Sequence, residues 1–172
     1  MTEHIKHLKI GHILQKHFSK ENLVLDYACT NDTPKQQIPL FSVIEKSASS
    51  RLCNIDAALL KDGFLRVIIE IEETGIIPTK ICGKFLTSAF AEYLIHNSIC
   101  GSPVKINDCL FVQILNDQNL ESNTKKRKQG EMIAKKINEL PNKGHIKEYE
   151  LFWYSDVIAN SDTLISKLRK FI

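Results

Sequence analysis

Apolar and polar residues follow one another along this chain with two distinct periods. Apolar residues at helical spacing predict helices over three segments, 4–18, 78–96 and 122–140, with a last helix from about Ser161. Alternating or near-continuous apolar runs predict strands over 22–30, 52–60, 64–73, 108–116 and 146–156. The segment 39–51 fits either a short helix or an extended chain.

The expected order is helix, three strands, helix, strand, helix, strand, helix. Consecutive strands predict an antiparallel meander, and strands separated by helices predict crossovers within one sheet. Asp-Gly in "KDG" (61–63) is a strong hairpin signal between the second and third strands. We therefore expect an α/β fold with a single mixed β-sheet flanked by helices, forming one domain over residues 1–172.

Composition changes this picture little. The five cysteines form no CxxC pair, which favours a reducing, cytoplasmic setting with buried thiols over a zinc site. No apolar run approaches the roughly 20 residues of a membrane span, so we expect no membrane partner. The net charge of +3 permits a polyanionic partner without requiring one. His4 and His7 share a helix face and could bind a metal, but a solvated helix start is the commoner reading, and we predict no site there.

Three carboxylates interrupt the apolar hairpin "CNIDAALLKDGFLRVIIEIEE" (53–73). Glu70 and Glu72 point to one face of their strand because side chains alternate along a strand. Whether Asp56 joins them depends on the hairpin register. A three-residue loop pairing Leu60 with Phe64 makes Asp56 and Glu70 diagonal neighbours, with Cβ atoms roughly 5–8 Å apart.

This register also puts Asp56 opposite Ile68 and Glu70 opposite Asn54. A two-residue loop would instead turn Asp56 to the other face. Like charges at such proximity repel when half buried, and Mg²⁺, which takes carboxylate and water oxygens, would relieve the repulsion. Glu45, eleven positions before Asp56, is a candidate outer ligand. The alternatives are a wet strand end for the acids and a surface turn for Glu45.

An acid in one strand, a hairpin, and then Glu-x-Glu at the end of the next strand before a helix resembles the PD-(D/E)xK nuclease superfamily. The predicted element order also resembles the core of that superfamily. The resemblance implies a Mg²⁺-dependent phosphodiesterase acting on DNA, with Mn²⁺ as an expected substitute. It makes Asp56 and Glu70 metal ligands and puts Glu72 where lysine is usual, to hold a second ion or orient the attacking water.

In some members of that superfamily the lysine lies in the following helix. Lys80 and Lys84 lie one turn apart on one helix face, so either could reach back to the acids. There it would help to deprotonate the water or neutralise the phosphate. The alternative for both lysines is a solvated helix face.

Cations are concentrated in "NTKKRKQ" (123–129), at the start of a predicted helix, where they oppose the helix dipole. Lys125, Lys126, Arg127 and Lys128 are therefore predicted DNA phosphate contacts, with a soluble basic loop as the alternative. Arg51, just before the acidic strand, is a further candidate.

The leading prediction is a magnesium-dependent endodeoxyribonuclease, with a type II restriction enzyme as one form of it. A homodimer would match a palindromic site. The main alternative is a catalytically inactive module of the same fold for DNA binding or protein interaction. A hydrolase of RNA or of a substrate other than nucleic acid is a third possibility.

Overall fold

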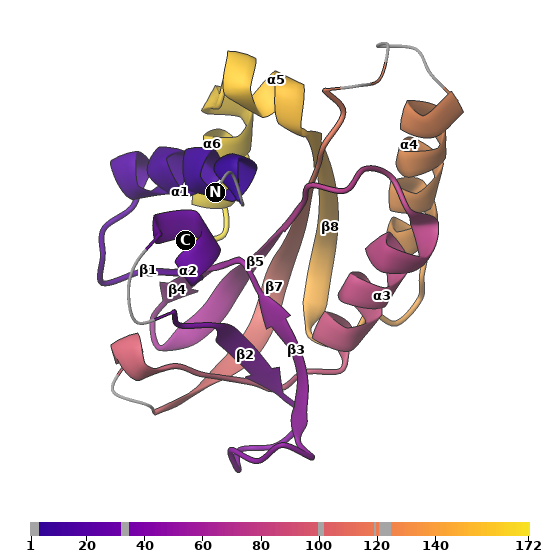
Figure 1. Cartoon of the computed structure of the whole chain (residues 1–172). Helices are drawn as coiled ribbons and strands as arrows, with labels where there is room; N and C mark the ends of the chain where they lie inside the picture. The colour runs from indigo at the N-terminus through magenta and orange to yellow at the C-terminus, as the bar shows by residue number, and fades with distance from the viewer. Residues whose placement is uncertain (1–3, 32–34, 100–101, 119, 121–124) are drawn as a thin grey trace.

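The computed structural model describes residues 4–31, 35–99, 102–118, 120 and 125–172. An eight-stranded mixed sheet lies between two layers of helices (Figure 1). The strands are β1 (Leu23–Leu25), β2 (Ile38–Phe41), β3 (Arg51–Ile55), β4 (Ala57–Lys61), β5 (Phe64–Glu72), β6 (Tyr93–Ile95), β7 (Pro103–Leu115) and β8 (Ile146–Trp153). The helices are α1 (Ile5–His17), α2 (Tyr27–Thr30), α3 (Pro78–Ala89), α4 (Lys125–Asn138), α5 (Tyr154–Ala159) and α6 (Asp162–Arg169), with a 3-10 turn η1 (Asn97–Ile99).

The middle of the sheet follows the order β1-β4-β5-β7-β8. β1, β4 and β5 pair antiparallel, while β5, β7 and β8 pair parallel. The start of β7 also pairs with β6, which leads on to β2 and β3. The expected meander followed by helical crossovers in a mixed sheet is thus confirmed.

Each sheet face carries its own hydrophobic core. On one face α3 and α4 pack on β5, β7 and β8, and the rings of Phe85, Phe111 and Tyr149 lie 5.8 Å from one another. On the other face α1, α5 and α6 cover the sheet, with Ile10 and Leu164 fully buried. Helices on both faces explain why β7 reads as a near-continuous apolar run.

Several predicted boundaries were wrong. The strand expected over 22–30 ends at Leu25, because Asp26 caps α2 by accepting the Ala28 N–H at 2.8 Å. The helix expected to reach residue 96 ends at Ala89, and 93–95 form β6, which pairs with strands on both sides. Residues 38–41 are the strand β2, and the last strand gives way to α5 at Tyr154.

The β4–β5 hairpin differs from the expected register in two ways. Its loop has two residues, Asp62 and Gly63, with φ of 53° and 78°, as a type I′ turn requires, and Lys61 pairs with Phe64. This loop alone would turn Asp56 away from Glu70.

A register shift between Leu59 and Leu60 reverses that effect. Leu60 pairs with Leu65 but Leu59 pairs with Val67, so Arg66 is an extra, bulged residue in β5. Ala57 consequently pairs with Ile69, and Asp56, one residue earlier, lies level with Glu70 on the same face. The expected shared face is correct, although the expected pairing of Asp56 with Ile68 is wrong.

None of the described helices is long and apolar enough to serve as a membrane span.

Candidate active site

Three charged side chains converge where β3 passes into β4. Asp56 lies in the bend between those strands, Glu70 is in β5, and Lys84 projects from α3. The Lys84 ammonium lies 2.5 Å from Glu70 Oε2 and 3.8 Å from Asp56 Oδ2. The structure thus brings together both predicted metal-binding acids and one of the two predicted lysines.

Glu70 is the most enclosed member, with 1% of its side chain exposed. Burial, followed by the negative charge of Asp56, raises the pKa of Glu70 well above its ordinary value, although Lys84 acts in the opposite direction. Glu70 Oε1 is buried and has no hydrogen-bond partner in the described part of the chain. An unpaired buried carboxylate oxygen is costly, so this atom is one that a bound ligand would satisfy.

Asp56 is held by three elements. Its Oδ2 accepts the Ile71 N–H at 2.6 Å, and its Oδ1 lies 3.4 Å from His7 Nε2 of α1. Burial opposes ionisation of Asp56, but His7 and Lys84 outweigh it and lower the pKa of this carboxyl. Asp56 is therefore the ionised acid of the pair and Glu70 the one that resists ionisation.

The Lys84 ammonium already supplies one positive charge beside these acids, so part of the repulsion that Mg²⁺ was expected to relieve is relieved without it. Glu70 and Asp56 in turn raise the pKa of Lys84 despite its burial. The residues still fit a divalent cation of the magnesium class. The carboxylates of Asp56 and Glu70 offer oxygen ligands of the required kind, and Glu70 Oε1 has no hydrogen-bond partner among the residues that the structure describes.

Glu72 lies on the same face as Glu70 but contacts different residues. Its Oε1 accepts the Thr74 N–H at 3.0 Å and a short hydrogen bond from the Thr74 hydroxyl, and Lys80 Nζ lies 3.8 Å away. Lys80 therefore forms its ion pair with Glu72, and Lys84 forms ion pairs with Glu70 and Asp56. The sequence alone did not distinguish the two lysines.

Glu45 does not join this site. It is exposed in the connection between β2 and β3, at the bottom of Figure 1. The whole of β3, about 16 Å at the usual rise per residue, separates this connection from Asp56. The predicted outer ligand is wrong because the segment before β3 is a surface turn, held in part by the Ser50 hydroxyl bonding the Glu45 carbonyl at 2.6 Å.

The predicted DNA contacts divide into structural and exposed residues. Arg127 is mostly buried: its guanidinium pairs with Asp117, bonds the Ser155 hydroxyl at 3.2 Å and lies 4.9 Å from the centre of the Trp153 ring. Its interpretation as a free phosphate contact is wrong, because this network fastens α4 to the end of β8.

The other basic residues are exposed, namely Lys125, Lys126, Lys128 and Arg51. Lys126 Nζ lies 3.5 Å from the Ile76 carbonyl, so the start of α4 lies beside the connection that leaves the acidic strand. Arg51 bonds the Gln37 side chain at 2.7 Å and also that of Asn54. Residues 123 and 124 of the predicted basic segment lie outside the described part of the chain.

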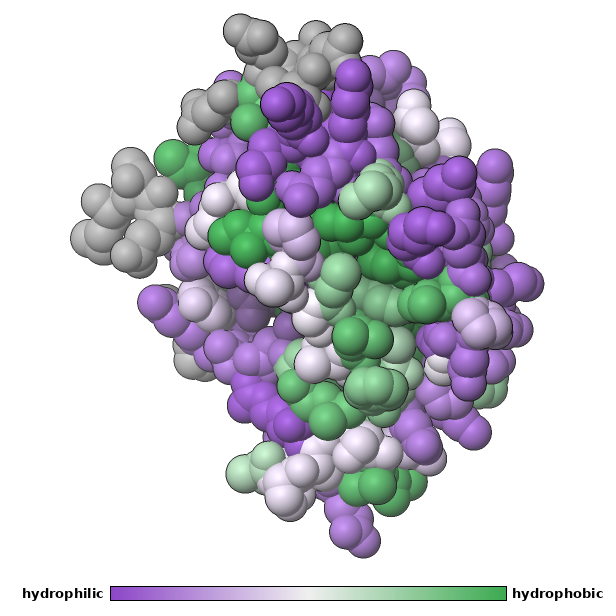
Figure 2. Space-filling model, turned by 90° about the vertical axis from the view of Figure 1, so that its right-hand side faces the viewer, coloured by the Kyte–Doolittle hydropathy of each residue, from purple (hydrophilic) through white to green (hydrophobic). Residues whose placement is uncertain are grey.

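The face formed by α3 and α4 is apolar at its centre. Leu86 in α3, Phe90 at its C-terminal end and Met132 in α4 are exposed. Figure 2, which looks at this side of the molecule, shows an apolar region bordered by hydrophilic side chains. DNA phosphates gain nothing from such a centre, so any DNA contact on this side has to use the charged margin.

Two polar residues of the site were missed. His7, which was expected to belong to a solvated helix start, is instead buried and contacts Asp56, 49 positions away. Its helical spacing from His4 was the available signal. Gln113 is the β7 neighbour of Glu70, is 1% exposed, and accepts the Tyr149 hydroxyl at 2.6 Å. A glutamine inside the apolar run "CLFVQIL" was the available signal.

Comparisons of the chain with protein-family models, with curated proteins and with solved structures find no match. The resemblance to the nuclease superfamily therefore stays a prediction.

Proposed function

We propose that this protein is a Mg²⁺-dependent phosphodiester hydrolase that acts on DNA. The observation that carries the proposal is the grouping of Asp56, Glu70 and Lys84, in which Glu70 Oε1 is buried and has no hydrogen-bond partner among the described residues. Two acids and an ammonium in one place are the components needed to bind a cation and a phosphate together.

Asp56 and Glu70 would hold the cation, and Mn²⁺ would bind to the same oxygens. When bound, the cation supplies a lowered pKa for a coordinated water and charge stabilisation for the phosphate. A cation also favours the ionised form of Glu70, whose pKa burial otherwise raises.

Lys84 would act as an electrostatic group. Because its pKa is raised by the two acids, it keeps its proton at neutral pH and is a poor base. Its ammonium would turn from Glu70 toward a non-bridging phosphate oxygen when the cation takes its place. Glu72, fixed by Thr74 and Lys80, is suited to orienting a water molecule.

DNA would approach along the exposed cations at the start of α4. The contact of Lys126 with the Ile76 carbonyl puts this helix end next to the segment between Glu72 and α3. Lys125 and Lys128 are exposed on the first turns of the same helix. A homodimer, as a palindromic target would require, belongs to the same proposal.

A second candidate is a nuclease-like module without catalytic activity. Lys84 favours it, because an ammonium at 2.5 Å from Glu70 can replace the cation permanently. Glu72 in the usual place of a lysine favours it as well.

Cleavage of supercoiled plasmid DNA in Mg²⁺ or Mn²⁺ tests the proposal. The parent should nick the plasmid, while Asp56→Asn and Glu70→Gln should lose at least 100-fold in rate, consistent with loss of a metal ligand. Asp62→Asn is the matched control: Asp62 is an exposed carboxylate in the same hairpin, and asparagine tolerates its positive φ.

Each result separates the candidates. Cleavage that survives Asp56→Asn would mean a contaminating nuclease and would refute the site. Metal-independent DNA binding without cleavage would favour the inactive module. Cleavage of RNA or of a small phosphodiester, with DNA left intact, would support the proposed active site but would show that its substrate is not DNA.

A further inference from the structure

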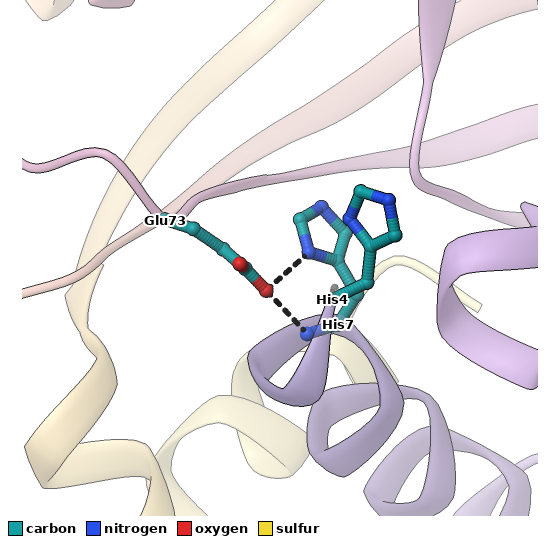
Figure 3. A group of neighbouring side chains, drawn as sticks. All are labelled: His4, His7 and Glu73. Carbon is teal, nitrogen blue, oxygen red and sulfur yellow. Dashed lines mark hydrogen bonds and ion pairs between the residues drawn. The ribbon is translucent and has the colours of Figure 1, made fainter. Parts of the chain in front are cut away.

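A second cluster lies on the other side of Asp56, at the start of α1. His4 directly precedes that helix, His7 lies in its first turn, and Glu73 directly follows β5 (Figure 3). One ligand atom from each of the three lies within 4.8 Å of the others. His7 Nδ1 lies 2.8 Å from Glu73 Oε1, and the two imidazole rings are 5.4 Å apart.

We propose that His4, His7 and Glu73 form a binding site for a zinc-class divalent transition metal. Two imidazoles and one carboxylate are a ligand set that Zn²⁺ accepts, with a fourth position left for water or another ligand. Nitrogen ligands favour Zn²⁺, Co²⁺ or Ni²⁺ over Mg²⁺, which prefers oxygen. This site is therefore chemically distinct from the one at Glu70, and metal binding here stands whether or not the chain cuts DNA.

The carboxylate is already positioned for this role. Glu73 Oε1 accepts the backbone N–H groups of Lys6 at 3.1 Å and of His7 at 3.3 Å, which fixes it over the first turn of α1. His4 packs edge-on against Tyr27, with ring centres 6.0 Å apart. These contacts reduce the conformational freedom that metal binding has to remove.

The ligand atoms would have to move by at most about 1.5 Å, since they now lie within 4.8 Å of one another. Ligand bonds of about 2.0–2.2 Å at a tetrahedral angle separate two ligand atoms by about 3.3–3.5 Å. His7 Nδ1 and Glu73 Oε1, at 2.8 Å, would have to move apart by about half an ångström. The metal would replace the proton that these two atoms now share.

Asp56 would act as the outer partner of the metal ligand His7. With Nδ1 on the metal, the opposite Nε2–H points to Asp56 Oδ1 at 3.4 Å, an arrangement that fixes the ring and strengthens the ligand. The same carboxylate faces Lys84 and Glu70. Asp56 thus links the two sites, and occupancy of one orients the acid of the other.

Titration of chelator-treated full-length protein with Co²⁺, followed by visible absorption, tests the site, with Zn²⁺ displacement measured by calorimetry. We expect one equivalent in a site of low coordination number. His4→Ala and Glu73→Gln should each weaken binding by at least 10-fold. The matched control is His12→Ala, since His12 is exposed on the same helix and lies outside the cluster. Equal loss in this control, or no loss in the first two variants, would overturn the site.

Two further variants test the role of Asp56. Asp56→Asn should weaken Co²⁺ binding by roughly 10–100-fold, as loss of an outer partner does. Glu70→Gln should leave it unchanged. A loss in Glu70→Gln that matches the loss in Asp56→Asn would mean that the metal sits between those acids, which contradicts the proposal. Circular dichroism of each variant separates lost binding from lost folding, and no DNA is involved, so failure here is distinct from failure of the nuclease assay.

Discussion

Replacing Lys84 with methionine tests the electrostatics of the candidate active site most directly. The methionine side chain keeps an unbranched apolar stem at this position of α3 but removes the ammonium that faces Glu70 and Asp56. Glu70, 1% exposed, then has to be buried as an unpaired charge or take up a proton. Protonation is the cheaper course and sets the upper limit of the cost.

The limit follows from the ordinary glutamate pKa. Holding a proton on Glu70 at pH 7 costs about 3.7 kcal/mol, since glutamate titrates near about 4.3 and each pH unit is worth about 1.4 kcal/mol. The parent already bears part of this cost because the pKa of Glu70 is raised even beside Lys84. Lys84 is 32% exposed, which weakens the pair further. We expect Lys84→Met to lower the free energy of unfolding by about 1–3 kcal/mol at pH 7.

The sign of the pH dependence is fixed by the raised pKa. A glutamate with a raised pKa in the folded state costs nothing below its ordinary pKa, and the cost grows as the pH rises above it. The upper limit therefore shrinks to about 1.6 kcal/mol at pH 5.5. The gap between variant and parent should narrow as the solution is acidified.

Urea unfolding followed by fluorescence of Trp153, the single tryptophan, measures these differences. Lys80→Met is the control, since Lys80 is 48% exposed and 3.8 Å from its acid, and should cost less than about 1 kcal/mol. If a cation binds these acids, Mg²⁺ at 100 times its Kd should restore about 2.7 kcal/mol to Lys84→Met. A loss independent of pH, or one equal to that of the control, would refute the reasoning.

Two further predictions concern the support of the site. Gly11→Ala puts a Cβ 2.0 Å from the Cys29 carbonyl oxygen and should strongly lower the midpoint of thermal unfolding. Gly83→Ala, in α3, adds a Cβ where there is open space and should raise the free energy of unfolding by about 0.5–1 kcal/mol. Arg127→Ala should lower the free energy of unfolding by about 2–4 kcal/mol, because Arg127 belongs to a buried network. Lys128→Ala, at an exposed neighbouring position, should lower it by less than about 0.5 kcal/mol. Urea unfolding at pH 7 measures both, and equal losses would contradict the structural role of Arg127.

The placement of Asp56 shows how far local reasoning reaches. Alternation and the Asp-Gly signal predicted a hairpin and a shared face for Asp56 and Glu70, and both are present. The predicted route was wrong, since a two-residue turn and a bulge at Arg66 each shift the pairing by one residue in the same direction. The total shift of two residues restores the shared face but moves the partner of Asp56 from Ile68 to Glu70. The Asp62-Gly63 pair is typical of a two-residue turn, whereas nothing in the sequence around Arg66 predicts that it is the bulged residue.

The sequence by itself determined the periods of its elements, the mixed α/β sheet, the common face of Glu70 and Glu72, and the presence of lysines within reach from α3. These features depend on neighbours a few positions apart, which act through strand alternation and helix turns. Only the tertiary structure decided that Lys84 serves Glu70, that Arg127 is a structural residue, and that His7 lies against Asp56. Those contacts join segments far apart in the chain, and they form where whole layers pack together, a condition that no local pattern encodes.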